Sequence, residues 1–439
     1  MVNNHFAPEK IEKELSFASI LTGIYIIIWY LGVGNRIPVL GAIRIEFILG
    51  FILFVLSAIS IAGHKKTDSD NLVSVAIILL IILGLYTVFS YDRDTSITIY
   101  IDRVVKFAML SLFIAAFCRT LTALKFFIFC LLIAWLKMGS EGFIGWYSGS
   151  LVWENQGIPR LHGPTGATAH PNSFSGFAVG TLPFIFYLFP LSKKFWQKSI
   201  LLVMGIFAAV IIISTGSRTG YVATSFFLLY FGYELKVSKF KILILLVLVT
   251  FLASPFIDDS YKDRFASIFT QEEAEGHSSE TRLIILEDAW EIYKSYPLGV
   301  GVEAFPAVRI DMFGRFQDTH NLYLQILTNT GPLGFWCFIL LIMKIINLNK
   351  KNILKNLNYI SDFKKNESLA IDSSENKVIK EKEFLIAISK AIIGFIIIRL
   401  FLGLFGMDLY EIYWWLAIGL TLSVNTITNH KCSIDYCEK

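Results

Sequence analysis

Residues 318–346 read DTHNLYLQILTNTGPLGFWCFILLIMKII, and they carry the chain from a long polar loop into an apolar run. A run of about 20 apolar residues is long enough to cross a bilayer as a helix. Asp318 or Thr319 is expected to cap the start of this helix, because a short polar side chain accepts hydrogen bonds from the first free backbone amides. Gly331 and Pro332 lie inside the run and predict a bend or a break. The stretch therefore predicts a membrane helix that begins at a polar rim and is interrupted along its length.

The rest of the chain repeats this apolar character. Of its 439 residues, 55% are hydrophobic and only 17% are charged, and the mean hydropathy is +0.60. This composition excludes a soluble globular protein of this size. Lipid offers backbone amides no hydrogen-bond partners, and the alternating pattern of a barrel strand is absent, so the apolar runs are expected to be helices. The predicted fold class is an all-α polytopic membrane protein.

The apolar runs predict about twelve spans of roughly twenty residues each. Their ranges are 16–33, 43–62, 72–90, 104–118, 121–138, 173–191, 199–214, 219–234, 240–257, 321–346, 384–404 and 408–427. Basic residues concentrate in alternate connections, which by the positive-inside rule lie in the cytoplasm together with both termini. The resulting organisation is a cytoplasmic N-terminus (1–15), spans 1–9 (16–257) with an outward loop at 139–172, a long periplasmic loop (258–319) between spans 9 and 10, span 10 (320–346), a flexible cytoplasmic linker (347–383), spans 11 and 12 (384–427) and a cytoplasmic tail (428–439). The N-terminus lacks the short apolar core and the cleavage site of a secretory signal, so the first span is expected to be retained.

The long periplasmic loop is predicted to contain a helix of its own. Apolar residues follow Thr281-Arg282 at helical spacing and stop before Pro297; they are Leu283, Leu286, Trp290 and Tyr293. This pattern is typical of an amphipathic helix. A loop of this length with its own helix is usually functional.

Three basic residues are predicted to meet on the outer side. Arg218 lies in the tight turn STGSRTG (214–220) between two spans, Arg282 opens the loop helix, and His320 opens the tenth span. Helix N-termini offer free amides and a positive dipole end, and arginine adds a planar fork that suits phosphate oxygens. Together these residues favour a diphosphate site at the membrane surface.

Each of the three residues also has a purely structural interpretation. Arg218 alone is typical of an arginine that positions a helix end, although its flanking glycines would let a ligand approach the backbone. Arg282 alone favours an ion pair with Glu280 or Glu287, and His320 alone is as consistent with a helix cap as with a general base. The placement of all three on one side favours a site.

A second set of polar residues is predicted to bind substrate. In the first outward loop, Arg160, His170 and Asn172 are candidates for contacts with sugar hydroxyls or a second phosphate, although a glycine-rich loop with two histidines is more often only a loop. The outer half of the tenth span is polar, and polar groups at that depth are expected to face a cavity. A kink packed against its neighbours explains the same residues equally well. The predicted substrate-binding residues are Arg160, His170, Asn172, Ser217, Asn321, Tyr323 and Gln325.

No metal, cofactor or nucleic-acid site is predicted. An alternative interpretation is a metal site that combines three histidines, namely His162, His170 and His277, with the acidic residues of 258–275. These residues have no recognisable ligand spacing. The triplet Asp92-Arg93-Asp94 could hold a divalent cation, yet such triplets arise often by chance. A phosphate-cradling loop of the P-loop type is absent from the sequence. The cysteines lie in spans or in the tail and form no disulfide framework.

The ordered set of blocks resembles the O-antigen ligase and polymerase superfamily of bacterial envelope glycosyltransferases. The resemblance rests on Gly216-Ser217-Arg218-Thr219-Gly220, on Thr281-Arg282 through Trp290 to Pro297-Leu298-Gly299-Val300-Gly301, and on His320-Asn321 followed by Gly331 and Gly334. It covers roughly residues 200–346, while the flanking spans agree only in number and topology. Each short block alone is weak, and the order and spacing of all three make the set fairly specific.

The resemblance implies a C-type glycosyltransferase-like bundle that acts without a metal at the periplasmic face of the bacterial cytoplasmic (inner) membrane. Such proteins move a glycan from undecaprenyl diphosphate to an acceptor sugar hydroxyl, which belongs to lipid A core in a ligase and to the growing glycan in a polymerase. Carried over to this sequence, Arg218 and Arg282 would bind the diphosphate leaving group, and His320 would orient or deprotonate the acceptor. The chemistry agrees, since a departing diphosphate develops negative charge and an attacking hydroxyl benefits from a base. Ligase is the leading prediction and polymerase the alternative.

Two other function classes fit part of the pattern. A transporter or flippase for lipid-linked sugars would also use arginines and aromatic residues. It needs a polar path through the bilayer, however, whereas the polar groups here gather at one face. A structural scaffold for other envelope enzymes would tolerate alanine at Arg218, Arg282 and His320. An enzyme acting on a lipid-linked glycan is the leading prediction.

Overall fold

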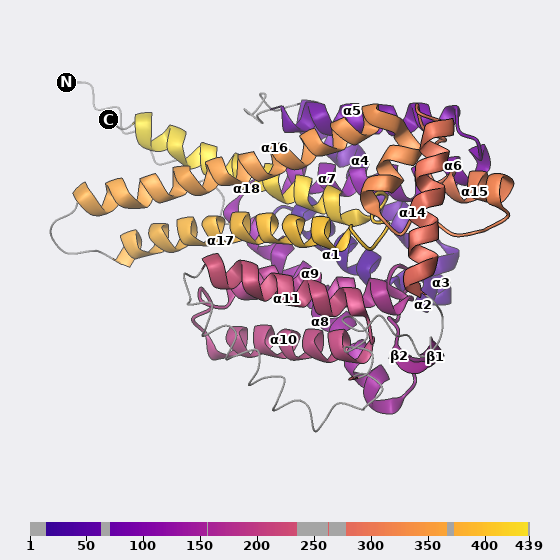
Figure 1. Cartoon of the computed structure of the whole chain (residues 1–439). Helices are drawn as coiled ribbons and strands as arrows, with labels where there is room; N and C mark the ends of the chain where they lie inside the picture. Colours follow the sequence, from indigo (N-terminus) through magenta and orange to yellow (C-terminus); the bar gives the residue numbers. More distant parts are fainter. Residues whose placement is uncertain are drawn as a thin grey trace, which may run out of the picture.

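The computed structural model describes residues 15–62, 71–155, 157–234, 262, 278–366 and 373–437. Over these residues the chain is a bundle of helices with one short hairpin (Figure 1). In chain order the elements are α1 (Phe17–Leu31), α2 (Val33–Arg36), α3 (Pro38–Ala42), α4 (Ile45–Ala62), α5 (Leu72–Val88), α6 (Arg93–Ile99), the π-helix η1 (Tyr100–Val105), α7 (Lys106–Phe117), α8 (Leu121–Ser148), β1 (Val152–Asn155), β2 (Ile158–Leu161), the 3-10 helix η2 (Gly166–Thr168), α9 (Pro171–Leu188), α10 (Phe195–Ser214), α11 (Arg218–Glu234), α14 (Ser278–Ser295), α15 (Phe305–Phe313), α16 (Leu322–Asn366), α17 (Ser373–Leu402) and α18 (Ile412–Cys437).

Long apolar helices form the body of the bundle. Within the described residues, four stretches are long and apolar enough to cross a membrane, namely Leu121–Ser148, Phe195–Ser214, Leu322–Phe363 and Lys377–Leu402. Shorter apolar helices are Phe17–Leu31, Ile45–Ser60 and Leu72–Val88. Every predicted span except 240–257 overlaps a helix, and 240–257 lies outside the described residues. The architecture is that of an all-α membrane protein, as predicted, and the count of twelve crossings stays a prediction.

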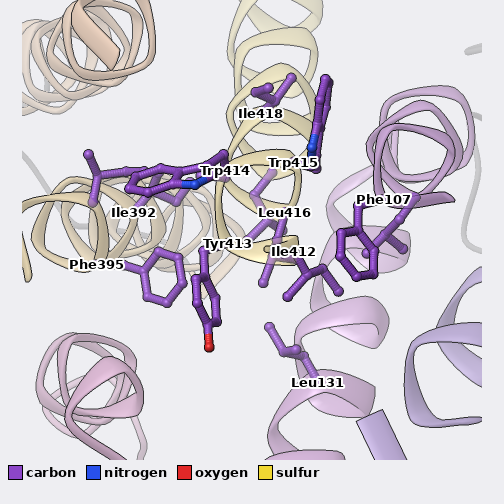
Figure 2. Packing of buried hydrophobic residues seen from close by; sticks show 14 of the residues in the cluster. Phe107, Leu131, Ile392, Phe395, Ile412, Tyr413, Trp414, Trp415, Leu416 and Ile418 are labelled. Atoms are coloured by element: carbon purple, nitrogen blue, oxygen red, sulfur yellow. The ribbon is translucent and has the colours of Figure 1, made fainter. Parts of the chain in front are cut away.

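The centre of the bundle is built around α18, whose large side chains point toward several neighbours (Figure 2). Trp414 meets Phe338 of α16 edge-on, with ring centroids 5.0 Å apart, and Tyr413 meets Phe395 of α17 at 6.0 Å. Edge-to-face pairs bring the positive edge of one ring to the negative face of the other. Lipid tails are as apolar as these side chains, so close packing of this kind, more than removal from water, holds membrane helices together.

The break predicted at Gly331-Pro332 is confirmed, and a distant loop docks on it. Gly331 adopts φ 58° and ψ −166°, which interrupts α16, and proline has no amide hydrogen to continue the helical pattern. The carbonyl oxygens of Thr328 and Asn329 accept hydrogen bonds from the amides of Val300 (2.9 Å) and Gly301 (3.0 Å) instead. Two of the sequence blocks, the Gly-Val-Gly segment and the Gly-Pro break, are therefore halves of one junction.

The cap of α16 is Asn321, and the prediction of Asp318 or Thr319 is wrong. Asn321 Oδ1 accepts hydrogen bonds from the amides of Tyr323 and Leu324, both at 3.0 Å. Asp318 instead accepts the amide hydrogen of Thr319 within the preceding loop, at 2.6 Å. All three side chains are chemically able to cap a helix, and the loop conformation decides which one does.

The predicted flexible linker at 347–383 is also wrong over its described part, because α16 and α17 extend into it as helices. Asn349 Nδ2 donates to Thr421 Oγ1 of α18 (2.8 Å), and Asn356 Nδ2 donates to Thr428 Oγ1 (3.1 Å). Both partners repeat after seven residues, which keeps them on one stripe of each helix. The polar composition that suggested disorder supplies hydrogen bonds between helices.

The first outward loop is shorter than predicted. α8 continues to Ser148, past the expected end at 138, and the chain then forms the antiparallel β1–β2 hairpin. Trp153 of β1 pairs with Arg160 of β2 in this hairpin. The loop is therefore an ordered element that carries a candidate site residue.

Candidate functional site

The predicted site residues lie at one end of the bundle, the right-hand end in Figure 1, where α14, α15 and the hairpin gather. α14 crosses the ends of the long helices there and packs on α15 and α16. The starts of α9, α11 and α16 and the end of α10 also belong to this region.

Arg160 ties three elements of this end together. Its Nε donates to the backbone oxygen of Thr215 (2.7 Å), in the turn between α10 and α11, and its Nη2 donates to Asn172 Oδ1 (2.7 Å) at the start of α9. The Arg160 side chain is fully buried, and a buried guanidinium is stable only when its hydrogens are engaged. Arg160 therefore fixes the α10–α11 turn relative to α9, and its predicted contact with substrate stays a prediction.

The α10–α11 turn places Arg218 at the first position of α11. Ser217 Oγ accepts a hydrogen bond from the amide of Gly220 (3.2 Å) and so caps the helix. A Cβ atom on Gly220 would collide with Ser175 Oγ of α9, so the absence of a side chain lets α9 and α11 approach each other. Arg218 is partly exposed. The tight turn predicted from STGSRTG is confirmed, with Ser217 used as its cap.

α14 confirms the predicted loop helix and holds Arg282 on its inner side. The buried face of α14 consists of Ile285, Asp288, Ala289 and Ile292. Arg282 precedes Ile285 by three residues and therefore lies on the same face. Two residues of the apolar stripe predicted from the sequence lie on the outer side of the helix, where Leu283 is 62% exposed and Trp290 is 50% exposed. α14 thus exposes apolar as well as charged side chains on its outer side, and Arg282 lies near the start of its inner face.

A buried arginine that sequence analysis missed lies in α15. Arg309 Nε donates to Asp288 Oδ2 of α14 (2.9 Å), and Arg315 approaches the same carboxylate at 3.2 Å. Two arginines thus share one carboxylate, which leaves a net positive charge. Arg309 Nη1 is buried and has no hydrogen-bond partner among the described residues. Asp288 gave a signal in the sequence, because it follows Ile285 by three residues and precedes Ile292 by four, which places an acidic residue on an apolar helix face.

His320 has an unusual backbone conformation. Its φ of 47° lies in the left-handed region, which residues other than glycine rarely adopt. Thr319 Oγ1 donates to the carbonyl oxygen of Asn321 (3.2 Å) across it, and the amide of Leu322 donates to the carbonyl oxygen of Gly403 (2.7 Å). Such residues persist only where the surroundings hold them, and they cluster at functional sites. The conformation therefore supports a constrained role for His320.

The arginines Arg160, Arg282 and Arg309 and the imidazoles of His170 and His320 lie near enough for their charges to act on one another. Burial lowers the pKa of His320, and the positive charges of Arg282 and Arg309 lower it further. His170 keeps an exposed edge, but partial desolvation and the charges of Arg160, His320 and Arg282 lower its pKa as well. At neutral pH both imidazoles are neutral while the arginines stay charged. The site thus combines fixed positive charge with an imidazole that is free to accept a proton.

A family model described as O-antigen ligase matches residues 200–339. The matched segment holds Arg218, Arg282 and His320, and it includes the Gly-Val-Gly loop that docks on the broken helix. This segment carries the similarity of the chain to the O-antigen ligase superfamily. A comparison with curated proteins found no match.

Beside the His320 loop lies a pair of carboxyl groups that sequence analysis did not select. Glu303 and Asp318 share a hydrogen bond, and Gln325 Nε2 lies 3.4 Å from Glu303 Oε2 and 3.5 Å from Asp318 Oδ2. Burial, followed by the charge of Asp318, raises the pKa of Glu303 to about 8, and burial also raises the pKa of Asp318. One proton is therefore shared by the pair at neutral pH. No periodicity marks Glu303, because it follows the Gly-Val-Gly junction in a left-handed conformation.

Three predicted substrate-binding residues of α16 are engaged within the protein. Asn321 caps the helix and donates from Nδ2 to the carbonyl oxygen of Leu404 (3.2 Å). Tyr323 donates its hydroxyl hydrogen to the carbonyl oxygen of Leu400 (2.9 Å). Gln325 is buried, and its Oε1 accepts the amide hydrogen of Leu409 (3.2 Å). These bonds give the three side chains a structural role, and their contact with substrate stays a prediction.

The residues considered for metal binding are only partly described. His277 and the acidic residues of 258–275 lie outside the described residues. Asp92 caps α6, since its Oδ1 accepts the amide hydrogen of Thr95 (3.3 Å). In the part of the chain that the structure describes, no group of three or more His, Cys, Asp or Glu side chains is placed to hold a metal ion.

Proposed function

We propose that this chain is a metal-independent glycosyltransferase that moves a glycan from undecaprenyl diphosphate to an acceptor sugar hydroxyl. The match of residues 200–339 to the O-antigen ligase family model supports a membrane enzyme of O-antigen ligase or polymerase type. The observation that carries the proposal is the placement of Arg160, Arg282, His170 and His320 at one end of the bundle, where, in addition to burial, the arginines lower the pKa of His170 and Arg282 also lowers that of His320. A group of fixed cations around a neutral base suits the expulsion of an anionic leaving group.

The proposed reaction is a direct displacement. The acceptor hydroxyl oxygen attacks the anomeric carbon while the bond from that carbon to the diphosphate oxygen breaks. The hydroxyl proton passes to the neutral ring of His320, and undecaprenyl diphosphate leaves with the bonding electron pair. Arg218 and Arg282 neutralise the charge that develops on the leaving group. A single displacement of this kind inverts the configuration at the anomeric carbon.

The isoprenoid chain of the donor would reach the site from the membrane, and α14 suits that approach. Its outer face carries the exposed Leu283 and Trp290, and its inner face begins with Arg282. Exposed apolar side chains of this kind would let α14 lie in the plane of the bilayer interface. At that depth Arg282 would meet the diphosphate of a carrier whose chain stays in the lipid.

The proposal includes a topology of about twelve spans in the bacterial inner membrane. The site end would face the periplasm and both termini the cytoplasm. Lys193, Lys194 and Lys198 support this orientation, because they lie at the connection between α9 and α10, at the end opposite the α10–α11 turn. The donor would accordingly be presented from the outer leaflet.

We propose a ligase with lipid A core as the acceptor, and a polymerase that extends the lipid-linked glycan as the alternative. Complementation of two hosts tests the choice, one lacking its ligase and one lacking its polymerase. Capped lipid A core in the first host supports the ligase, and ladders from single repeats in the second support the polymerase. Arg218→Ala, checked for equal abundance in the membrane, is expected to abolish either product. A chain that is abundant in both hosts and changes neither glycan would contradict a transferase.

A further inference from the structure

A groove lies at the end of the bundle far from the candidate site. It has a volume of about 450 Å³ and lies between the first turns of α8 and α10, the end of α9 and the first part of α17. Lys125 lines the groove near the start of α8, whereas the last residue of α8, Ser148, leads to the hairpin. Their separation of 23 positions (148 − 125) amounts to about 35 Å of helix. The groove and the site therefore lie near opposite faces of a bilayer.

The groove changes from charged to apolar along its length. Lys125 stands one turn into α8, and the lining residues that follow it on the same helix are all apolar: Ile128, Phe129, Leu132 and Ile133. On α10 the half-exposed Trp196 is followed by Ile200 and Leu201. Tryptophan favours the headgroup level of a bilayer, so the charged end of the groove lies at the interface and the apolar part lies in the hydrocarbon.

The charged end has a surplus of positive charge drawn from separate elements. Lys125 comes from α8, Lys193 from the connection between α9 and α10, and Lys380 from α17, and all three line the groove. Glu383 is the acidic residue of the lining, which leaves a net charge of +2 (3 − 1). A soluble anion would not use the apolar part, and a zwitterionic lipid would not use the excess of lysines. Charge and shape together fit an amphiphile with an anionic head.

We propose that this groove binds one anionic phospholipid, with its phosphate among the three lysines and an acyl chain against α8 and α10. The lipid would join α17 to α8, which here meet through the ammonium group of Lys125 over the ring of Phe384 at 5.4 Å. The proposal does not depend on glycosyl transfer, because the groove and the site share no residue.

Native mass spectrometry of the full-length chain in detergent tests the proposal, with phosphatidylglycerol and phosphatidylcholine of identical acyl chains titrated separately. Wild type is expected to retain one phosphatidylglycerol at least tenfold more tightly than phosphatidylcholine. The variant Lys125→Gln/Lys193→Gln/Lys380→Gln is expected to lose this affinity by roughly ten- to a hundredfold. The control variant Lys194→Gln/Lys198→Gln/Lys377→Gln removes the same charge from the same end of the bundle but outside the groove lining. It should keep the affinity for phosphatidylglycerol.

A variant that fills the apolar part of the groove provides a second test. Leu132→Trp occupies the apolar part and should weaken retention of both lipids, while elution as a single species in size exclusion shows that it folds. Equal retention of the two lipids by wild type would overturn the proposal, as would an equal loss in the two triple variants. Competition by glycerophosphate as effective as that by the intact lipid would also overturn it, because the acyl chain would then contribute nothing.

Discussion

The two ends of the bundle differ in how deeply their charged side chains are buried. At the site end, charged groups are buried and engaged by the protein: Arg160 and Arg309 are each 1% exposed, and Asp318 is 8% exposed. At the far end, the lysines of the groove lie at the surface, although Lys382 is buried over the ring of Tyr359. Burial of a charge is unfavourable unless partners replace its water, so a concentration of buried charges marks a region held in place for a purpose. At the site end these charges fix the loops that carry Arg218, Arg282 and His320.

The largest effect is expected where one buried charge would lose its partner. Asp288→Ala leaves Arg309 buried without its carboxylate and should lower the stability of the α14–α15 region by about 3–5 kcal/mol. Thermal unfolding in detergent, followed by intrinsic fluorescence, measures this. Arg315→Ala is the matched control, since Arg315 contacts the same carboxylate from a side chain that is 50% exposed, and it should change stability by about 0–1 kcal/mol.

A paired replacement sharpens that test. Asp288→Leu combined with Arg309→Met removes both charges and should recover most of the lost stability, because apolar side chains of similar size can replace a buried ion pair. Equal losses in Asp288→Ala and Arg315→Ala would show that burial at this end does not strengthen the interaction. The contrast drawn between the two ends would then fail.

Activity is the next test of the comparison. Arg218→Ala and Arg282→Ala should each reduce the transfer rate by about 10²–10³-fold, the loss typical of one group that stabilises developing negative charge. Replacement by lysine should restore only part of the rate, because the planar fork is lost. Transfer from a lipid-linked donor in proteoliposomes gives the rate. Lys194→Ala and Lys198→Ala, at the far end, should leave it within about twofold, and a similar loss in all four variants would remove the distinction between the ends.

The sequence predicted the fold where one physical signal dominates. Uninterrupted apolar runs allowed a helical membrane protein and nothing else, and Gly331-Pro332 predicted the break in α16. Prediction failed where several residues are chemically equivalent, as at the α16 cap. It also failed at 347–383, where asparagines that look solvated pair with threonines of α18. Composition alone does not reveal a distant partner.

The sequence predicted the basic residues of the candidate site but not the residues that hold them in place. Arg218, Arg282 and His320 were selected because each stands at a helix start, which is a local signal. Glu303 and Arg309 were missed because their importance arises from contacts across the fold, with Asp318 and Asp288. Residues that act through a partner far along the chain leave little trace in local spacing.

The shared proton of Glu303 and Asp318 predicts a pH effect on stability. Burial raises the pKa of Glu303 from its ordinary 4.5 to about 8, so the folded protein binds this proton more tightly than the unfolded chain. The stabilisation is complete below about pH 4.5 and is lost as the pH rises through about 8. Wild type should therefore unfold at a lower temperature at pH 9 than at pH 5. Glu303→Gln, which stays neutral, should be more stable than wild type at pH 9 by about 1–3 kcal/mol.

A matched control tests that expectation. Glu291→Gln changes an exposed carboxylate of α14, and its unfolding temperature should follow that of wild type at every pH. If Glu303→Gln also follows wild type between pH 5 and pH 9, the carboxyl pair does not share a proton, and burial does not raise the pKa of Glu303.

The smallest effect concerns Asn321, where structural and substrate-binding roles make different predictions. Asn321 Oδ1 accepts two amide hydrogens at the start of α16, so Asn321→Ala should lower stability by about 1 kcal/mol. Asn321→Asp keeps the accepting oxygen and should retain most of that stability, although it loses the bond from Nδ2 to Leu404. If Asn321 bound substrate instead, alanine would raise KM and leave the unfolding temperature unchanged. The structural role changes the unfolding temperature, whereas the substrate-binding role changes KM. This variant therefore separates a residue that holds the rim of the site from one that touches the donor or acceptor.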